Sequence, residues 1–246
     1  MIPLWQRPLF QASPNSAQFF WLMWFHGPLP ELRVSRQEHG IPEGPVAAFE
    51  VFPIEDRDWL AAFLEGPVAG LAGNEPWLEP LKSCSQGIAV RGNFEDQPDL
   101  RNLQTGLAFV KALCHQGAAA VLDGIGMRWY PAEDFLLREP DRPFQLHEHV
   151  TLVVETGVDP LMHTRGMAKF ARPELLLRHH PREHRQEMAD RMWAMAEALA
   201  LGQWPPEASL QLHEDDTDSP SPSHGLGDSM FRNACLEWSI DQGLLT

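Results

Sequence analysis

The sequence predicts an α+β fold, with a mixed sheet packed against helices, and three observations lead to this prediction. Apolar runs of strand length occur at residues 19–26, 47–54 and 150–155, and turn-forming residues bound them. A strand, an amphipathic helix and a second strand follow one another at about 87–126. A second long helix is expected at about 182–201, so both element types occur within one chain of 246 residues.

The segment 87–126 carries the clearest pattern. The residues GIAVRGNF favour a strand, Asp96 is expected to cap the next helix, and Gly117 to end it. The helix has apolar residues at helical spacing, namely Leu100, Leu103, Leu107, Val110 and Cys114. AAAVLDGI then reads as a second strand, so the segment predicts a strand-helix-strand crossover unit.

The remaining elements follow from the same reasoning. Residues 56–72 predict a helix that Gly66 and Pro67 interrupt, and residues 173–178 predict a short strand. The helix at 182–201 presents one apolar stripe, formed by Met188, Met192, Met195 and Leu199.

The chain divides into three parts by composition. Residues 1–18 are polar and rich in proline, which is typical of an N-terminal arm, and residues 19–202 are expected to form a single α+β domain. Residues 203–246 carry eight acidic residues against one arginine. This last part is predicted to be an acidic, partly disordered C-terminal segment, although its residues 231–240 are apolar enough to dock on the domain.

Composition restricts the partners and the compartment. A net charge of −15 disfavours nucleic acid and anionic membranes as partners. The longest apolar run has seven residues, Phe19 to Phe25, and no N-terminal signal pattern is visible. The three cysteines are widely spaced, so we expect a cytoplasmic protein with cysteines as core residues. No GxGxxG motif or Walker loop occurs, and we predict no cofactor.

The most informative stretch is the basic segment, residues 163–185. It holds six Arg and Lys residues against two Glu residues in a chain that is acidic overall. Such clustering predicts a site for an anion or an acidic partner, with the candidate residues Arg165, Gly166, Lys169 and Arg172. Asp123, at the end of a predicted strand, and His163 are secondary candidates.

Other interpretations of the basic segment remain open. Its cations can form a solvated face that pairs with neighbouring acidic residues. The acidic stretch Glu214 to Asp218 can also fold onto it within the same molecule.

Histidine pairs raise the question of a metal site. His147 and His149 alternate on a predicted strand, and His180 and His184 are four residues apart. No HExxH motif and no cysteine pair accompanies them, and the surrounding Arg and Lys residues would repel a cation. We therefore predict no metal.

Two segments carry a resemblance to known families. These are NFEDQPDLRNLQTGLAFVKALCHQGAAAVLDGIGMRWYPAEDF, from residue 93, and HTRGMAKFARPELLLR, from residue 163. They resemble bacterial domain families of unknown function that share an RGMxxFxxPEL-type motif. The resemblance spans about residues 86–178 and implies a bacterial α+β domain. It implies no activity and no catalytic residue, but some relatives are suspected of belonging to contact-dependent or secretion-linked systems.

These observations predict a non-catalytic cytosolic interaction protein of bacterial type, of the immunity or accessory kind. The alternative is a binder of, or an enzyme acting on, a small anionic substrate held by Arg165, Lys169 and Arg172. The two hypotheses differ in shape, because an enzyme would place these cations in a pocket and an interaction protein on an open face.

Overall fold

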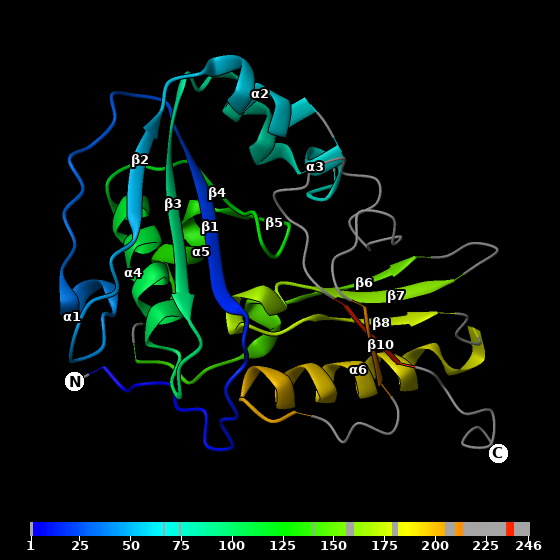
Figure 1. Cartoon of the computed structure of the whole chain (residues 1–246). Coiled ribbons are helices and arrows are strands. Elements are labelled where there is room, and N and C mark those ends of the chain that lie inside the picture. Colours follow the sequence, from blue (N-terminus) through cyan, green and yellow to red (C-terminus); the bar gives the residue numbers. More distant parts are fainter. Residues whose placement is uncertain are drawn as a thin grey trace.

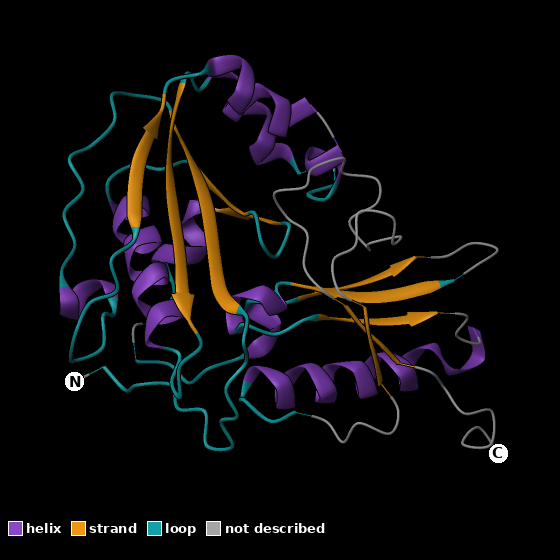
Figure 2. Cartoon of the chain, viewed as in Figure 1, coloured by secondary structure: helices purple, strands orange, loops and turns teal. Residues whose placement is uncertain are grey.

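The computed structural model describes residues 2–65, 67–73, 75–139, 141–155, 160–178, 182–204, 210–213 and 235–238. They form two five-stranded sheets with helices packed on their faces (Figure 1 and Figure 2). The α+β prediction is confirmed, and the strands divide between two sheets, one of them mixed. No described helix is both long and apolar enough to cross a bilayer.

The first sheet is antiparallel throughout. Its strands lie in the order β2 (Glu50–Ile54), β3 (Gln86–Glu95), β1 (Ser16–Phe25), β4 (Ala120–Asp123) and β5 (Arg128–Pro131). The predicted crossover unit consists of β3, α4 (Arg101–His115) and β4. Because β3 and β4 both run antiparallel to β1, they are parallel to each other with β1 between them. The crossover is therefore a split one.

The central position of β1 explains its continuous apolar sequence. Phe19, Trp21 and Met23 face the core that α4 covers, together with α5 (Ala132–Leu136). Leu22 and Trp24 point to the opposite face and pack against α2 (Arg57–Glu65). A strand buried on both faces does not alternate between polar and apolar residues.

Short helices pack around the first sheet and α4. The predicted helix at 56–72 divides into α2 and α3 (Pro67–Gly70), and the 3-10 helix η1 (Pro76–Ser83) follows them. The short helix α1 (Arg36–His39) lies against α4.

The second sheet is mixed, because β8 and β10 run parallel while its other neighbours are antiparallel. The order is β6 (Thr151–Glu155), β7 (Leu161–Arg165), β8 (Glu174–Arg178), β10 (Cys235–Trp238) and β9 (Leu210–His213). α6 (Arg185–Ala200) follows one side of this sheet (Figure 1) and buries Met188, Met192 and Leu199. The strands expected at 150–155 and 173–178 and the helix expected at 182–201 are all present.

Both ends of the chain contribute to the fold. Trp5 is buried in the main core, and its backbone N–H donates to Gln104 Oε1 at 3.0 Å. Strands β9 and β10 come from the segment 203–246, which is predicted to be acidic and partly disordered. The acidic stretch Glu214 to Asp218 lies outside the described residues.

Candidate binding groove between the two sheets

The predicted anion site begins with a sharp turn at Gly166. This residue has φ +116, and a Cβ there would lie 2.5 Å from the carbonyl oxygen of His149, so only glycine fits. The carboxylate of Glu174 accepts the backbone N–H groups of Gly166 and Met167, both at 3.0 Å, and the hydroxyl of Thr164 at 2.8 Å. The turn is thus fixed from inside the protein and leads into the 3-10 helix η3 (Met167–Phe170).

Lys169 points into the protein rather than toward solvent. Its side chain is buried, and its ammonium forms an ion pair with Asp123 Oδ2. Asp123 Oδ1 accepts the backbone N–H groups of Ile125 and Gly126, at 3.1 and 2.9 Å. Burial lowers the pKa of Lys169, and the Asp123 carboxylate opposes this shift. The two predicted candidates Lys169 and Asp123 therefore meet, but as a buried structural pair.

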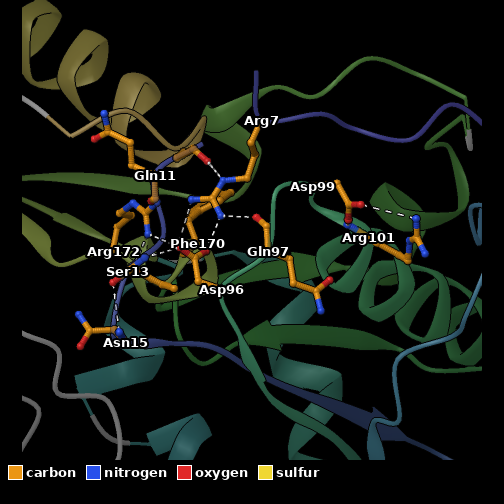
Figure 3. Close-up of polar contacts among 12 residues, drawn as sticks. Arg7, Gln11, Ser13, Asn15, Asp96, Gln97, Asp99, Arg101, Phe170 and Arg172 are labelled. Carbon is orange, nitrogen blue, oxygen red and sulfur yellow. Dashed lines mark hydrogen bonds and ion pairs between the residues drawn. The ribbon is translucent and has the colours of Figure 1, made fainter. Parts of the chain in front are cut away.

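Arg172 is buried as well and belongs to an ionic cluster of three residues (Figure 3). Its Nη1 donates to Asp96 Oδ2 at 2.7 Å, and Arg7 pairs with the other oxygen of the same carboxylate. The guanidinium of Arg172 also donates to the carbonyl oxygen of Gln11 at 2.7 Å. The cluster ties the N-terminal arm to both sheets.

The expected role of Asp96 as a helix cap is wrong. The N-cap of α4 is Leu100, and Asp99 Oδ1 accepts the hydrogen bond of the Arg101 backbone N–H at 3.0 Å. The Asp96 carboxylate instead accepts hydrogen bonds from Arg7, from Arg172 and, at 2.9 Å, from the backbone N–H of Ser13.

Arg165 has a different position. Its side chain is partly buried and lines an open groove of about 560 Å³ that lies between the two sheets. Four consecutive residues, 150–153, form one wall of this groove, and residues 127–129 with Pro131 form another. Trp77, from η1, and Trp193, from α6, also line it. The three cations proposed from the sequence thus do not share one surface.

A second cation, Arg128, also lines the groove, and the sequence analysis did not identify it as a candidate. Arg128 is exposed, donates to the carbonyl oxygen of His147 at 2.8 Å, and stacks on the Tyr130 ring at 5.0 Å. Its position depends on the turn that Asp123 holds, in which Met127 has the unusual φ of +50. Arg128, Arg165 and His147 face only one acidic residue, Glu75, among the described groove residues.

The polar side chains on the described part of the groove lining are two arginines, a histidine, a glutamate and a threonine. The described lining includes no serine, cysteine, lysine or aspartate. Thr151 supplies the one hydroxyl on this lining, and it donates to the carbonyl oxygen of Gly126 at 3.0 Å. A nucleophile with an adjacent base, which acyl or phosphoryl transfer requires, is therefore not found among these residues.

The histidines considered as metal ligands are spread over different environments. His149 is buried against Phe144, with ring centroids 5.6 Å apart, whereas His147 is exposed at the groove. Burial, together with the positive charge of Lys169, lowers the pKa of His149 well below its usual value. His184 pairs with Glu187 at 3.5 Å, and His180 lies outside the described residues.

His163, the other secondary candidate, is buried in β7. Its Nε2 lies 3.4 Å from the Glu155 carboxylate, and burial lowers its pKa. It does not line the groove.

A histidine cluster that sequence reasoning missed lies elsewhere, at α1. His39 Nε2 is 3.1 Å from His115 Nδ1, and Glu38 lies 3.8 Å from the same nitrogen. The backbone N–H of Ser35 donates to His39 Nδ1 at 2.8 Å, so the neutral ring carries its proton on Nε2. A metal-binding histidine usually donates from its second nitrogen instead of accepting there. The cluster is better explained as a hydrogen bond between the two imidazoles.

Cys84 is the cysteine with an imidazole neighbour among the described residues, 3.3 Å from His26 Nδ1. Burial raises the pKa of its thiol, which disfavours the reactive thiolate. All three cysteines are buried and free of disulfides.

No family model, no curated protein and no solved structure matches this chain. The resemblance to bacterial families with an RGMxxFxxPEL-type motif therefore stays a prediction. Within the structure, the residues of that motif form the Gly166 turn, η3 and the start of β8.

Proposed function

We propose that this protein is a non-catalytic interaction protein whose partner binds in the groove between the two sheets. The observation that carries the proposal is the combination of Arg128 and Arg165 with partly buried strand residues and tryptophans in one open groove. Arginine and tryptophan are the residues that most often dominate the energy of protein interfaces. The lining, which lacks a nucleophile and base pair among its described residues, supports binding rather than catalysis.

The cellular setting is part of the same proposal. Three buried free thiols suit a reducing cytosol, in which disulfides are rare. The bacterial origin and the immunity or accessory role rest on the sequence resemblance alone.

A second candidate function uses the same groove. Two guanidinium groups in one concave site suit a small ligand with a phosphate or carboxylate group. Lys169 and Arg172 already serve as internal ion-pair partners, so Arg128 replaces them in this version of the hypothesis.

Selection from a random dodecapeptide library on the full-length protein tests the first function. We expect an enriched family of peptides whose binding is lost in Arg128→Glu. Arg33→Glu is the matched control, because Arg33 is an exposed arginine outside the groove lining that pairs with Glu31. The proposal fails if nothing is enriched, or if Arg128→Glu selects the same peptides.

A thermal-shift screen with pyrophosphate and citrate tests the second function. Stabilisation at low salt that disappears in Arg165→Gln, together with a failed peptide selection, would replace the interaction protein with a small-anion binder. If neither anion shifts the melting temperature, the small-ligand hypothesis is dropped.

A further inference from the structure

We infer that the partner binds as an extended peptide strand that adds to the edge of β6 that pairs with no other described strand, with acidic side chains directed toward Arg128 and Arg165. This inference rests on the proposed function and specifies how the groove binds and what it binds. In strand addition, main-chain hydrogen bonds provide affinity and side-chain pockets provide specificity.

The first argument is the position of β6 in its sheet. Within the described part of the chain, β6 pairs with β7 on one side and has no strand on the other. Residues 150, 151, 152 and 153 all line the groove. Residues 151–153 belong to β6, and successive strand residues point to opposite faces of a sheet, so the groove reaches the edge of β6. Arg165 enters the same groove from β7, on the other side of β6.

The second argument is that this edge lacks the usual protection. Edge strands are commonly blocked by proline, lysine or a bulge. The first sheet follows this rule, because β2 contains Pro53 and β5 ends at Pro131. β6 has the sequence TLVVE, in which the exposed Glu155 is the one charged residue and neither proline nor lysine occurs, and Val154 is 37% exposed. Such an edge readily accepts a further strand.

The third argument is charge, which selects an acidic occupant. Arg128 and Arg165 lie on the lining with His147, against Glu75 alone among the described groove residues. Glu155 of β6 and Glu174 of β8 interact electrostatically with Arg165. Arg128 is solvent-exposed. Carboxylates on a bound strand would form charge-assisted hydrogen bonds with these guanidinium groups.

The aromatic residues complete the expected specificity. Trp77 and Trp193 offer apolar surface within the same groove. Because alternate residues of a bound strand point in opposite directions, acidic side chains can face the arginines while apolar ones face the indoles. We therefore expect the bound sequence to alternate acidic and apolar residues.

A second copy of this chain is a poorer occupant of the same edge. Each copy carries a net charge of −15, and like net charges oppose association. An acidic dodecapeptide carries a much smaller net charge than a second copy of the chain, so the protein repels it less.

The test is a scan of single backbone N-methyl groups through a selected dodecapeptide, with binding measured to the full-length protein. N-methylation removes one donor and leaves the protein unchanged, so folding is not at risk. We expect affinity to fall about tenfold at alternate positions, where the amide faces β6, and to change little at the positions between. Hydrogen exchange should slow in residues 151–155 when the peptide binds.

The outcomes separate this inference from the proposed function. Peptides that bind through Arg128 but show no alternation in the scan, and no protection of residues 151–155, overturn strand addition and leave the interaction protein standing. A failed selection overturns both. A dimer of the free protein in sedimentation that Val153→Lys dissociates would assign the edge to a second copy and overturn the peptide occupant.

Discussion

Cations of the same type have opposite surroundings in two regions of this molecule. In the protein interior, Lys169 is 2% exposed and Arg172 is fully buried, and each meets a carboxylate. In the groove, Arg128 is exposed and Arg165 lines open space. Arg165 and Lys169 are separated by one tight turn, so a cation's role here depends on whether its side chain points into the core or lines the groove.

Asp123 connects the two regions. One carboxylate oxygen pairs with buried Lys169, while the other holds the turn that leads to Arg128. A carboxylate that is fixed in the core thereby helps to position Arg128 in the groove.

The largest effect should come from Asp96→Asn. This change leaves Arg7 and Arg172 buried without their carboxylate, and removing one partner of a buried ion pair costs about 3–5 kcal/mol. Urea unfolding measures the loss. Glu50→Gln is the matched control, because its pair with Arg91 is well exposed and should contribute under about 1 kcal/mol. Equal losses in the two variants would contradict a structural role for the cluster.

A double-mutant cycle on Lys169 and Asp123 should give the next largest effect. Lys169→Met leaves the buried carboxylate unpaired and should cost about 3–5 kcal/mol. Asp123→Asn retains an oxygen for the turn N–H groups. The double variant should be more stable than the sum of the single losses implies, by about 0.5–3 kcal/mol. Strict additivity would show that the two charges do not interact.

Local patterns predicted most of the fold. The apolar spacing from Leu100 to Cys114 identified α4, and the apolar run from Phe19 identified β1. β7 was missed, because LMHTR shows no polar and apolar alternation even though its central residues are buried. The insertion of β1 between β3 and β4 was missed as well, since pairing of distant strands leaves no local signal.

The candidate site was predicted only in part, for a related reason. The basic segment has excess positive charge because its balancing carboxylates lie far away in sequence, with Asp96 76 residues from Arg172 and Asp123 46 residues from Lys169. Counting charges in a window cannot detect such pairs. Arg165 was identified as a candidate, but Arg128 was not, because it stands alone among uncharged neighbours.

The pH dependence of stability should come next in size. His149 is buried, and its pKa in the folded protein lies well below that of the unfolded chain. The unfolded state therefore binds more protons below about pH 6.5, and the unfolding free energy should fall by up to about 1.4 kcal/mol per pH unit as the pH decreases below about 6.5. His149→Phe retains a ring against Phe144 and should reduce this slope. Unfolding curves at several pH values measure it, and an unchanged slope would show that His149 is not responsible.

The smallest effect on stability should come from Arg128→Gln, although its effect on binding should be large. The Arg128 side chain is exposed, with one hydrogen bond to the His147 carbonyl and a stack on Tyr130, so the loss should stay below about 1 kcal/mol. Its affinity for a selected acidic peptide should fall at least about tenfold, because a charge-assisted hydrogen bond is lost. Unfolding and peptide titration of the same preparation measure both quantities. A destabilisation as large as that of Asp96→Asn would place Arg128 among the structural cations, and the difference between the two regions would disappear.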